Sequence, residues 1–400
     1  MEKLAINGGQ PIINRQFPTK LLGVSQLGDE EKKELAEVID NKTPFRHYGL
    51  GIPEKVYHFE EMVAERFRVP YPLALTSGSA ALFCAAYALG LGPGDEVILP
   101  TLSWYSDFGC IVQIGATPVF AGIDETLNLD PADFEAKLTP RTKAVIVVHY
   151  QGGAAKMDEI LSIAKKRGVA VIEDIAQAFG GMYKDRILGT IGDVGVASFQ
   201  MNKMITAGEG GLLITSDKKI YEKAVRYHDL GFVRPVFEKR LDDPSICADD
   251  RSTVGQQYRM GELAGAVLCA QFLKLDGMLN KCGHYHKYIK KALGDGLFSF
   301  RPTEHGDCGI TIFIKFNSSE EAQKFIKALA AEGVPIGPSS SCVNMLTAEQ
   351  TAKVIKIDEK MRDATEEMLN RYLAIGIGPS YDDKNIEDII SAVKKVRRLL

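Results

Sequence analysis

The chain has few of the residues that build disulfide frameworks or metal sites. Its 400 residues include seven cysteines, and no two of them form a CxxC pair. Because zinc sites and disulfide scaffolds need closely spaced or evenly paired cysteines, we expect neither, and we expect no metal in the active site. An odd number of scattered cysteines is typical of a reducing compartment, so we predict a cytoplasmic protein.

Long apolar runs and an excess of one charge are also missing. Residues 1–18 have no apolar core followed by a cleavage site, and no run is long enough to span a bilayer. The net charge of −4 and pI near 6.1 give no electrostatic reason to bind nucleic acid or an anionic membrane. We therefore expect neither a nucleic-acid nor a membrane partner.

The length and the pattern of the chain predict two domains after an N-terminal segment. Short apolar runs alternate with helical stretches in the first part, which predicts an α/β domain with a mainly parallel sheet. After about residue 275 the pattern changes to that of a smaller α+β domain. The expected divisions are an N-terminal segment 1–28, a large domain 29–275 and a small C-terminal domain 276–400.

Individual elements follow from periodicity and turn residues. The charged, turn-rich stretch 234–251 predicts a surface loop. The expected strands are 73–75, 96–99, 118–120, 144–148, 169–172, 194–199, 211–214 and 309–316. The expected helices are 29–39, 56–67, 80–89, 157–166, 262–273, 284–293, 320–332 and 386–398.

Lys203 is the most informative single residue. It follows the apolar strand 194–199 within a few residues and precedes the Gly-rich turn 208–211. Such a place can desolvate an amine and favour the neutral form that imine chemistry requires. A lone lysine in this local pattern is more often a solvated loop residue, so the pattern needs support from elsewhere.

That support comes from the acidic end of strand 169–172. Asp174 could hold a protonated pyridine nitrogen, and Gln177 could hydrogen-bond a ring hydroxyl; the simpler alternative is an acid that caps a helix. A lysine able to form a Schiff base, together with an aspartate at a pyridine nitrogen, is the pairing expected around pyridoxal 5′-phosphate.

Other segments could complete such a site. The turn 76–82 lies between a strand and a helix, where backbone amides attract an anion, although an N-cap by Ser77 explains the pattern as well. Trp104, the only tryptophan, could stack on a planar ring, although a lone tryptophan more often fills a core. The candidates for a phosphate group are Gly78, Ser79, Ala80 and Ser198.

In order and spacing, these stretches resemble the DegT/DnrJ/StrS family of sugar aminotransferases over roughly the first two thirds of the chain. The strongest similarity is in 173–180 and in the Lys203 segment with 208–211. The resemblance implies a large domain of the aspartate aminotransferase type (fold type I), pyridoxal 5′-phosphate, and a homodimer with shared active sites. It makes Lys203 the Schiff-base lysine and assigns Asp174 to the pyridine nitrogen.

The same resemblance assigns the remaining roles. Gln177 would bind the ring hydroxyl, Trp104 would stack on the ring, and Ser198 with the amides of residues 78–80 would bind the phosphate. The loop 255–260 would reach the neighbouring subunit's site through Gln257. The family usually has asparagine at that position.

A second departure from the family pattern is Lys156, where the family tends to have aspartate.

Some relatives carry histidine in place of the Schiff-base lysine and act as dehydratases, so the presence of Lys203 favours transamination. Glutamate or glutamine would then donate the amine to a keto-sugar. The acceptor stays open among a nucleotide-linked keto-hexose, a keto-cyclitol and an oxidised octulosonate. Candidate acceptor contacts are Arg46, His47, Tyr48, Arg234 and Arg259.

Three alternatives compete with this interpretation. One is a pyridoxal-phosphate enzyme of another class, such as a sugar dehydratase. Another is a non-catalytic regulatory relative, against which Lys203, Asp174 and Gln177 argue. A nicotinamide-dependent oxidoreductase is disfavoured, because no GxGxxG motif follows an early strand with an acid about 20 residues further on.

Overall fold

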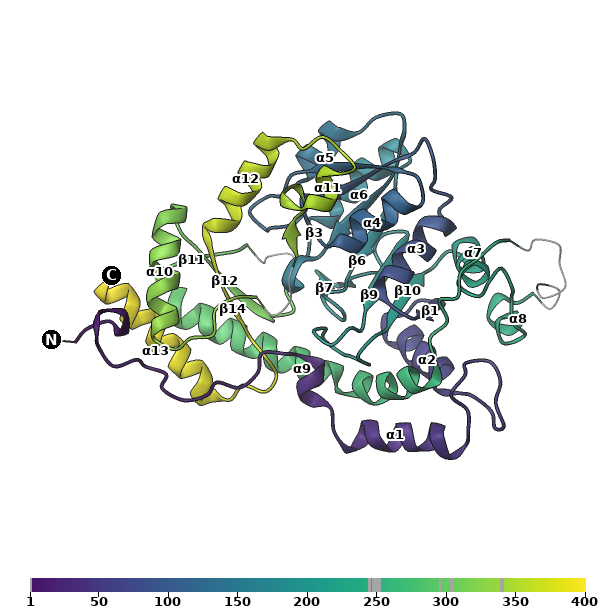
Figure 1. Ribbon diagram of the computed structural model, residues 1–400, viewed down its shortest axis with the longest axis horizontal. Helices are drawn as coiled ribbons and strands as arrows, with labels where there is room; N and C mark the ends of the chain where they lie inside the picture. Colours follow the sequence, from purple (N-terminus) through teal and green to yellow (C-terminus); the bar gives the residue numbers. More distant parts are fainter. Residues whose placement is uncertain (1, 244–245, 247–252, 295, 303–305, 339–341) are drawn as a thin grey trace.

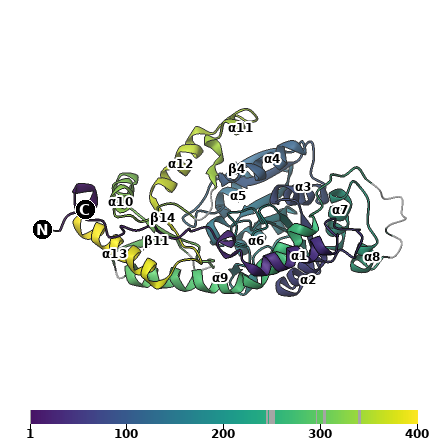
Figure 2. The same ribbon diagram turned by 60° about the horizontal axis from the view of Figure 1, so that its bottom comes forward.

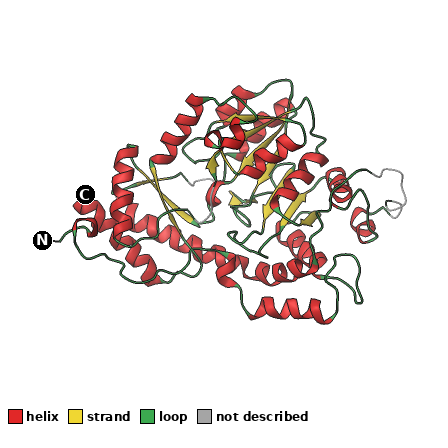
Figure 3. Cartoon of the chain, viewed as in Figure 1, coloured by secondary structure: helices red, strands yellow, loops and turns green. Residues whose placement is uncertain are grey.

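A computed structural model describes residues 2–243, 246, 253–294, 296–302, 306–338 and 342–400. Within them a seven-stranded sheet has the order β1-β10-β9-β6-β5-β2-β4 (Figures 1 and 3). Only β10 runs antiparallel to its neighbours in this sheet, so the sheet is mainly parallel, as predicted. Its strands are β1 Tyr71–Leu75, β2 Glu96–Pro100, β4 Thr117–Ala121, β5 Thr142–Val148, β6 Ala170–Asp174, β9 Val194–Ser198 and β10 Gly211–Thr215.

Alternate side chains of each strand enter two separate cores. In β5, Val145 and Val147 pack on one face of the sheet, whereas Ala144, Ile146 and Val148 pack on the other. Helices α2, α5, α6 and α9 cover the first face, and α3, α4 and α7 cover the second (Figure 2). This double cover explains why the strands read as continuous apolar runs.

The helices confirm most of the expected elements and add others that were not expected. Those not expected include α4, α5, α7 and α12. The surface loop expected at 234–251 was wrong in part, because α8 lies within it. Residues 244–245 and 247–252 of that stretch lie outside the described residues. The helices are α1 Asp29–Asp40, α2 Lys55–Phe67, α3 Gly78–Ala88, α4 Tyr105–Gln113, α5 Pro131–Lys137, α6 Met157–Arg167, α7 Lys218–His228, α8 Val236–Leu241, α9 Glu262–Gly294, α10 Ser319–Ala331, α11 Glu349–Ala352, α12 Glu359–Asn370 and α13 Asp383–Leu399.

Helix α9 is one continuous helix of 33 residues, so the expectation of two helices at 262–273 and 284–293 was wrong. It crosses residue 275, where the sequence pattern changes, and runs from the large sheet to a second, three-stranded antiparallel sheet (Figure 2). This smaller sheet consists of β11 Ser299–Phe300, β12 Thr311–Lys315 and β14 Tyr372–Gly376. Short two-stranded pairs join β3 Leu102–Ser103 to β13 Val343–Asn344 and β7 Met182–Tyr183 to β8 Arg186–Ile187.

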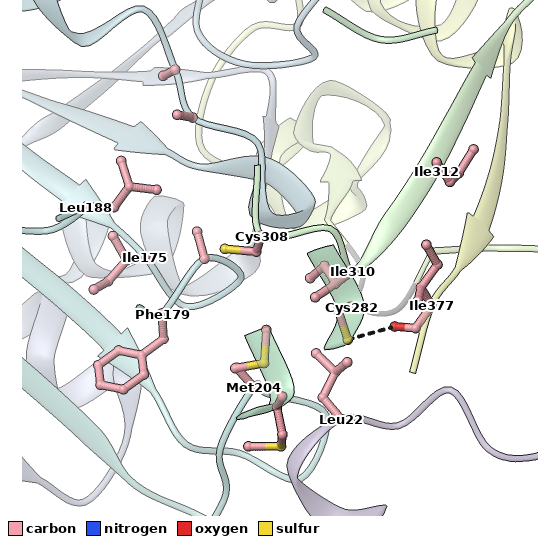
Figure 4. Close-up of a cluster of buried hydrophobic side chains, with 14 of the residues drawn as sticks. Leu22, Ile175, Phe179, Leu188, Met204, Cys282, Cys308, Ile310, Ile312 and Ile377 are labelled. Atoms are coloured by element: carbon pink, nitrogen blue, oxygen red, sulfur yellow. Dashed lines mark hydrogen bonds between the residues drawn. The ribbon is translucent and has the colours of Figure 1, made fainter. Parts of the chain in front are cut away.

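One apolar core joins the two sheets around α9 (Figure 4). Leu22 of the N-terminal segment, Phe179 from the turn after β6 and Met204, next to Lys203, meet Cys282 of α9 and Ile312 of β12 in this core. The loop that carries Lys203 is therefore fixed by buried contacts on both sides. No helix of the described chain is long and apolar enough to cross a membrane.

Candidate active site

A cavity of about 260 Å³ opens at the carboxyl ends of β6 and β9. This is the edge at which α/β sheets bind their ligands, because the loops that follow the strands meet there. Most of the residues proposed from the sequence share this cavity. They are Gly78, Ser79, Trp104, Asp174, Gln177, Ser198 and Lys203.

The N-terminus of α3 forms one end of the cavity. Gly78 lies so close to β9 that a Cβ atom there would come within 2.8 Å of the Cβ of Ser198, so only glycine fits without a shift. Ser77 caps the helix, and its Oγ accepts a hydrogen bond from the Ala80 N–H at 3.1 Å. Ala80 itself is buried and does not line the cavity. A helix N-terminus with hydroxyl groups suits a phosphate.

Lys203 lies in the loop between β9 and β10. Its backbone N–H donates to the Gln200 carbonyl at 2.9 Å, and its own carbonyl accepts from the Gly23 N–H at 3.0 Å. The side chain is half-buried, lines the cavity, and makes no ion pair with any residue that the structure describes. The backbone is thus held in place while the amine stays available for chemistry.

Asp174 ends β6 and is 8 % exposed. One carboxylate oxygen accepts from the Ala176 N–H at 2.8 Å. Burial raises the pKa of Asp174, and the charge of Lys203 and that amide only partly oppose the increase. A cationic pyridine nitrogen would supply the compensation that Asp174 lacks, so this site fits pyridoxal phosphate.

Its neighbour Glu173 points to the other side of the sheet and is fully satisfied. It accepts from the backbone N–H groups of Gly189, Ile191 and Gly192 at 3.0, 2.7 and 2.6 Å. His149, which the sequence interpretation did not include, lies 3.1 Å from it. Because His149 Nδ1 accepts from the Ala155 N–H at 3.1 Å, Nε2 carries the proton and donates to Glu173.

The Gln177 side chain is oriented from two directions. Its Oε1 accepts from the backbone N–H and from Nε2 of Gln151, both at 3.0 Å, and its Nε2 donates to Sγ of Cys342 at 2.8 Å. Burial raises the pKa of Cys342, so the thiol stays neutral. Trp104, by contrast, is 43 % exposed at the N-terminus of α4, lines the cavity and packs edge-on against the Tyr105 ring.

Several side chains at this site were not singled out in the sequence, and two of them, Ser106 and Asp107, lie next to predicted residues. Ser106 lines the cavity and shares a hydrogen bond with Ser79, with 2.7 Å between the two Oγ atoms. Asp107 is fully buried beside Asp174, and burial followed by the charge of Asp174 raises its pKa to about 8. The acid three residues after Trp104 was the available signal, but an acid there usually only caps a helix.

Gln257 does not lie in the cavity of its own chain. It is exposed and pairs through its backbone with Asp229. The buried carboxylate of Asp229 binds Arg234 at 2.7 Å and also binds Arg259, with His47 at 3.6 Å. Arg234, Arg259 and His47, which were predicted to contact the acceptor, therefore lie against an acid of their own chain.

Arg46 is held in the same way by Glu60, at 2.5 Å. Tyr48 is different, since it is 67 % exposed. Lys156 forms an ion pair with Asp124 at 2.9 Å, which accounts for a lysine at this position. The described residues contain no group of histidines, cysteines and acids that could hold a metal ion.

A family model matches residues 25–394, which is nearly the whole chain. The protein belongs to the DegT/DnrJ/EryC1/StrS aminotransferase family. Members of this family use pyridoxal 5′-phosphate, and this protein is accordingly a pyridoxal-phosphate-dependent aminotransferase with the fold type I architecture.

Curated relatives support this assignment. The spore coat polysaccharide biosynthesis protein SpsC of Bacillus subtilis is 32 % identical over 92 % of this chain and 95 % of its own length. GDP-perosamine synthase of Escherichia coli O157:H7 is 37 % identical over 64 % of this chain and 66 % of its own. L-glutamine:2-deoxy-scyllo-inosose aminotransferase of Micromonospora echinospora is 32 % identical over 69 % and 65 %.

A solved structure agrees with the fold. The aminotransferase from Psychrobacter cryohalolentis superimposes with a TM-score of 0.80 at 25 % identity, covering 96 % of this chain and 98 % of that one.

Proposed function

We propose that this aminotransferase moves an amino group from glutamate or glutamine to the keto group of a sugar or cyclitol, with Lys203 as the Schiff-base residue. The observation that carries the proposal is the shared cavity, into which Lys203 and Asp174 come from different loops. Pyridoxal phosphate, when bound, supplies an electron sink for the carbon atom that exchanges the amine.

Each side chain of the cavity then has a distinct task. Lys203, free of ion pairs within the described chain, would hold the cofactor through its amine and would serve as the base that moves the substrate proton. Asp174 would keep the pyridine nitrogen protonated, and Trp104 would provide an aromatic surface for the ring. Gln177, already oriented by Gln151, donates to the ring hydroxyl oxygen.

The phosphate belongs at the N-terminus of α3. There Gly78, Ser79 and Ser198 line the cavity, and the two amides and the Ser198 hydroxyl would bind the phosphate. Ala80 has already given its amide to Ser77, so its part is to stabilise the turn that holds this cradle. An anion at this point also gains from the dipole of the helix.

The acceptor is proposed from the relatives. One is named for GDP-perosamine and another for a glutamine-dependent transfer to a cyclitol. Arg46, Arg234 and Arg259 already bind Glu60 or Asp229 of this chain. We therefore assign the acceptor contacts to other groups, including those of a second subunit, in a homodimer where the exposed Gln257 reaches the neighbouring site.

Visible absorption spectroscopy of the purified protein tests the reaction. L-Glutamate or L-glutamine should bleach the band of the lysine-bound cofactor, and Lys203→Ala should fail to respond at a comparable rate. Lys184→Ala is the matched control, because Lys184 is exposed and lies outside the cavity, where its amine forms an ion pair with Asp158 at 2.6 Å and lies over the Tyr183 ring.

The contrary outcomes are distinct. A band that neither donor changes would point to another pyridoxal-phosphate reaction, such as dehydration, or to a regulatory relative. A protein that cannot take up the cofactor at all would show that Lys203 has been assigned wrongly.

A further inference from the structure

A second buried acid, Asp107, lies against Asp174 without a cation of its own. Asp107 belongs to the first turn of α4 and Asp174 to the end of β6, so the fold brings them together from separate elements. The two acids are close enough for the charge of Asp174 to raise the pKa of Asp107. Neither forms an ion pair with a described residue, although both are almost fully buried.

The hydrogen bonds of Asp107 leave one of its oxygens without a donor. Its Oδ2 accepts from the Ser103 hydroxyl at 2.5 Å and from the Trp104 N–H at 3.3 Å. Its Oδ1 receives no N–H or O–H group from the described chain. Two ionised carboxylates can only accept hydrogen bonds, so contact with Asp174 is favourable only if one of the two acids carries a proton.

The positions of the two acids indicate which one keeps that proton. Burial, then the charge of Asp174, raises the pKa of Asp107 to about 8, although the Ser103 hydroxyl, the Trp104 amide and the charge of Lys203 oppose the rise. Burial also raises the pKa of Asp174, and the Ala176 amide and then Lys203 oppose that rise. Lys203 therefore acts on both acids, but of the two only Asp174 lines the cavity, where a cofactor cation would compensate its charge. Asp174 is accordingly suited to be the anion, and Asp107, which is buried away from the cavity, is suited to carry the proton.

Two thiols among the described residues also interact with the pair. Burial, and after it the charge of Asp107, raises the pKa of Cys110 on α4 and of Cys342 before β13. Both thiols therefore remain neutral and add no charge to the pair.

We propose that Asp107 is a positioning residue that carries a proton and donates it to Asp174, so that the two acids present a single negative charge to the pyridine nitrogen of the cofactor. The proposal rests on the proposed function, because it takes Asp174 as the partner of that nitrogen. Asp107 does not line the cavity and acts only through Asp174. The Ala176 amide and the proton on Asp107 would then hold the Asp174 carboxylate from two sides.

Two substitutions separate a proton donor from a second negative charge. Asp107→Asn keeps an acceptor for Ser103 and an N–H donor for Asp174, so its dissociation constant for pyridoxal phosphate at pH 7 should stay within about twofold of wild type. Asp107→Ala removes the donor to a charged group and should weaken binding about tenfold or more. Equilibrium dialysis measures the constants, and circular dichroism checks that each variant is folded.

Infrared spectroscopy of the cofactor-free protein supplies a readout that does not depend on binding. The carbonyl stretch of a protonated carboxylic acid should be present at pH 7 and lost in Asp107→Asn. The proposal is overturned if the band is absent. It is also overturned if both variants bind the cofactor as tightly as wild type, or if Asp107→Asn binds it as weakly as Asp107→Ala.

Failure of the proposed function would look different. In that case wild-type protein and both variants would all fail to take up pyridoxal phosphate, while the infrared band would still report whether Asp107 is protonated. Asp174→Asn adds a reference, since it should weaken cofactor binding whichever state Asp107 is in.

Discussion

Glu60 and Asp174 are both buried acids, but the fold treats them in opposite ways. Glu60 on α2 accepts from Arg46 at 2.5 Å, from the Ala74 N–H at 2.7 Å and from Arg240 at 2.8 Å. Asp174 has one amide and faces a second acid instead of an arginine. A structural charge is compensated within the chain, whereas the charge at the cavity is left for a ligand to compensate.

The same contrast separates the arginines from Lys203. Arg234 and Arg259 share the buried carboxylate of Asp229, and Arg46 belongs to Glu60. Lys203 has no such partner in the described chain and lines the cavity. An ion-pair partner in the folded chain therefore distinguishes a structural cation from one that is available for catalysis. The sequence alone does not reveal which cations have such a partner.

Glu60→Gln should break the structural half of the comparison and give the largest effect. Two buried guanidinium groups would lose their counter-charge, which should lower the free energy of unfolding by about 3 kcal/mol. Urea unfolding measures the loss, with Asp158→Asn as the control, since Asp158 forms only exposed ion pairs. Equal losses in the two variants would show that Glu60 is not a structural charge.

Asp174→Asn should break the chemical half. Loss of the charge at the pyridine nitrogen should slow amine transfer by about 10²–10³-fold, by analogy with the loss of other preorganised electrostatic contacts. The free energy of unfolding of the cofactor-free protein should stay the same or rise, because a buried acid without a cation is removed. A large loss of stability with normal transfer by the folded fraction would reverse the assignment of the two acids.

Local sequence patterns were enough to predict the strands of the large sheet and two of the site residues. The apolar strands were found with their ends shifted by at most two residues in the large sheet, because double burial leaves a continuous apolar run. Asp174 was recognisable because it lies at the end of such a strand, and Lys203 because it follows another within a few residues. Asp107 was not, since an acid in the first turn of a helix has an ordinary local explanation and only the fold places it beside Asp174.

Helix α9 shows how a correct local signal can mislead. Gly277 and Gly283 suggest a break, yet the helix continues through both. Gly309 approaches so closely that its Cβ would lie 2.7 Å from the Cα of Gly283. Gly309 is therefore needed for close packing between α9 and the chain before β12, whereas a Cβ atom at Gly283 would have nothing within 4 Å.

The pH dependence of stability should sharpen the comparison. The pKa of Asp107 is raised from 3.8 to about 8, so the stability that its proton provides is fully present below about pH 4 and is lost as the pH rises to about 8. Cofactor-free wild-type protein should therefore lose more stability between pH 6 and 8 than Asp107→Asn. Thermal melts measure the difference, in which the contribution of buried histidines such as His228 cancels. Parallel curves would mean that Asp107 does not hold a proton in the fold.

Lys156 should give the smallest effect, because it is neither a buried structural charge nor a cavity residue. Its ion pair with Asp124 is 2.9 Å long, and the lysine side chain is 31 % exposed, so water and salt screen the attraction. Lys156→Ala should lower the free energy of unfolding by less than about 1 kcal/mol and leave amine transfer unchanged. Urea unfolding and the donor-bleaching rate test both expectations. A changed acceptor preference would instead place this departure from the family within reach of the substrate, and would show that a charge partnered in the fold can still serve the chemistry.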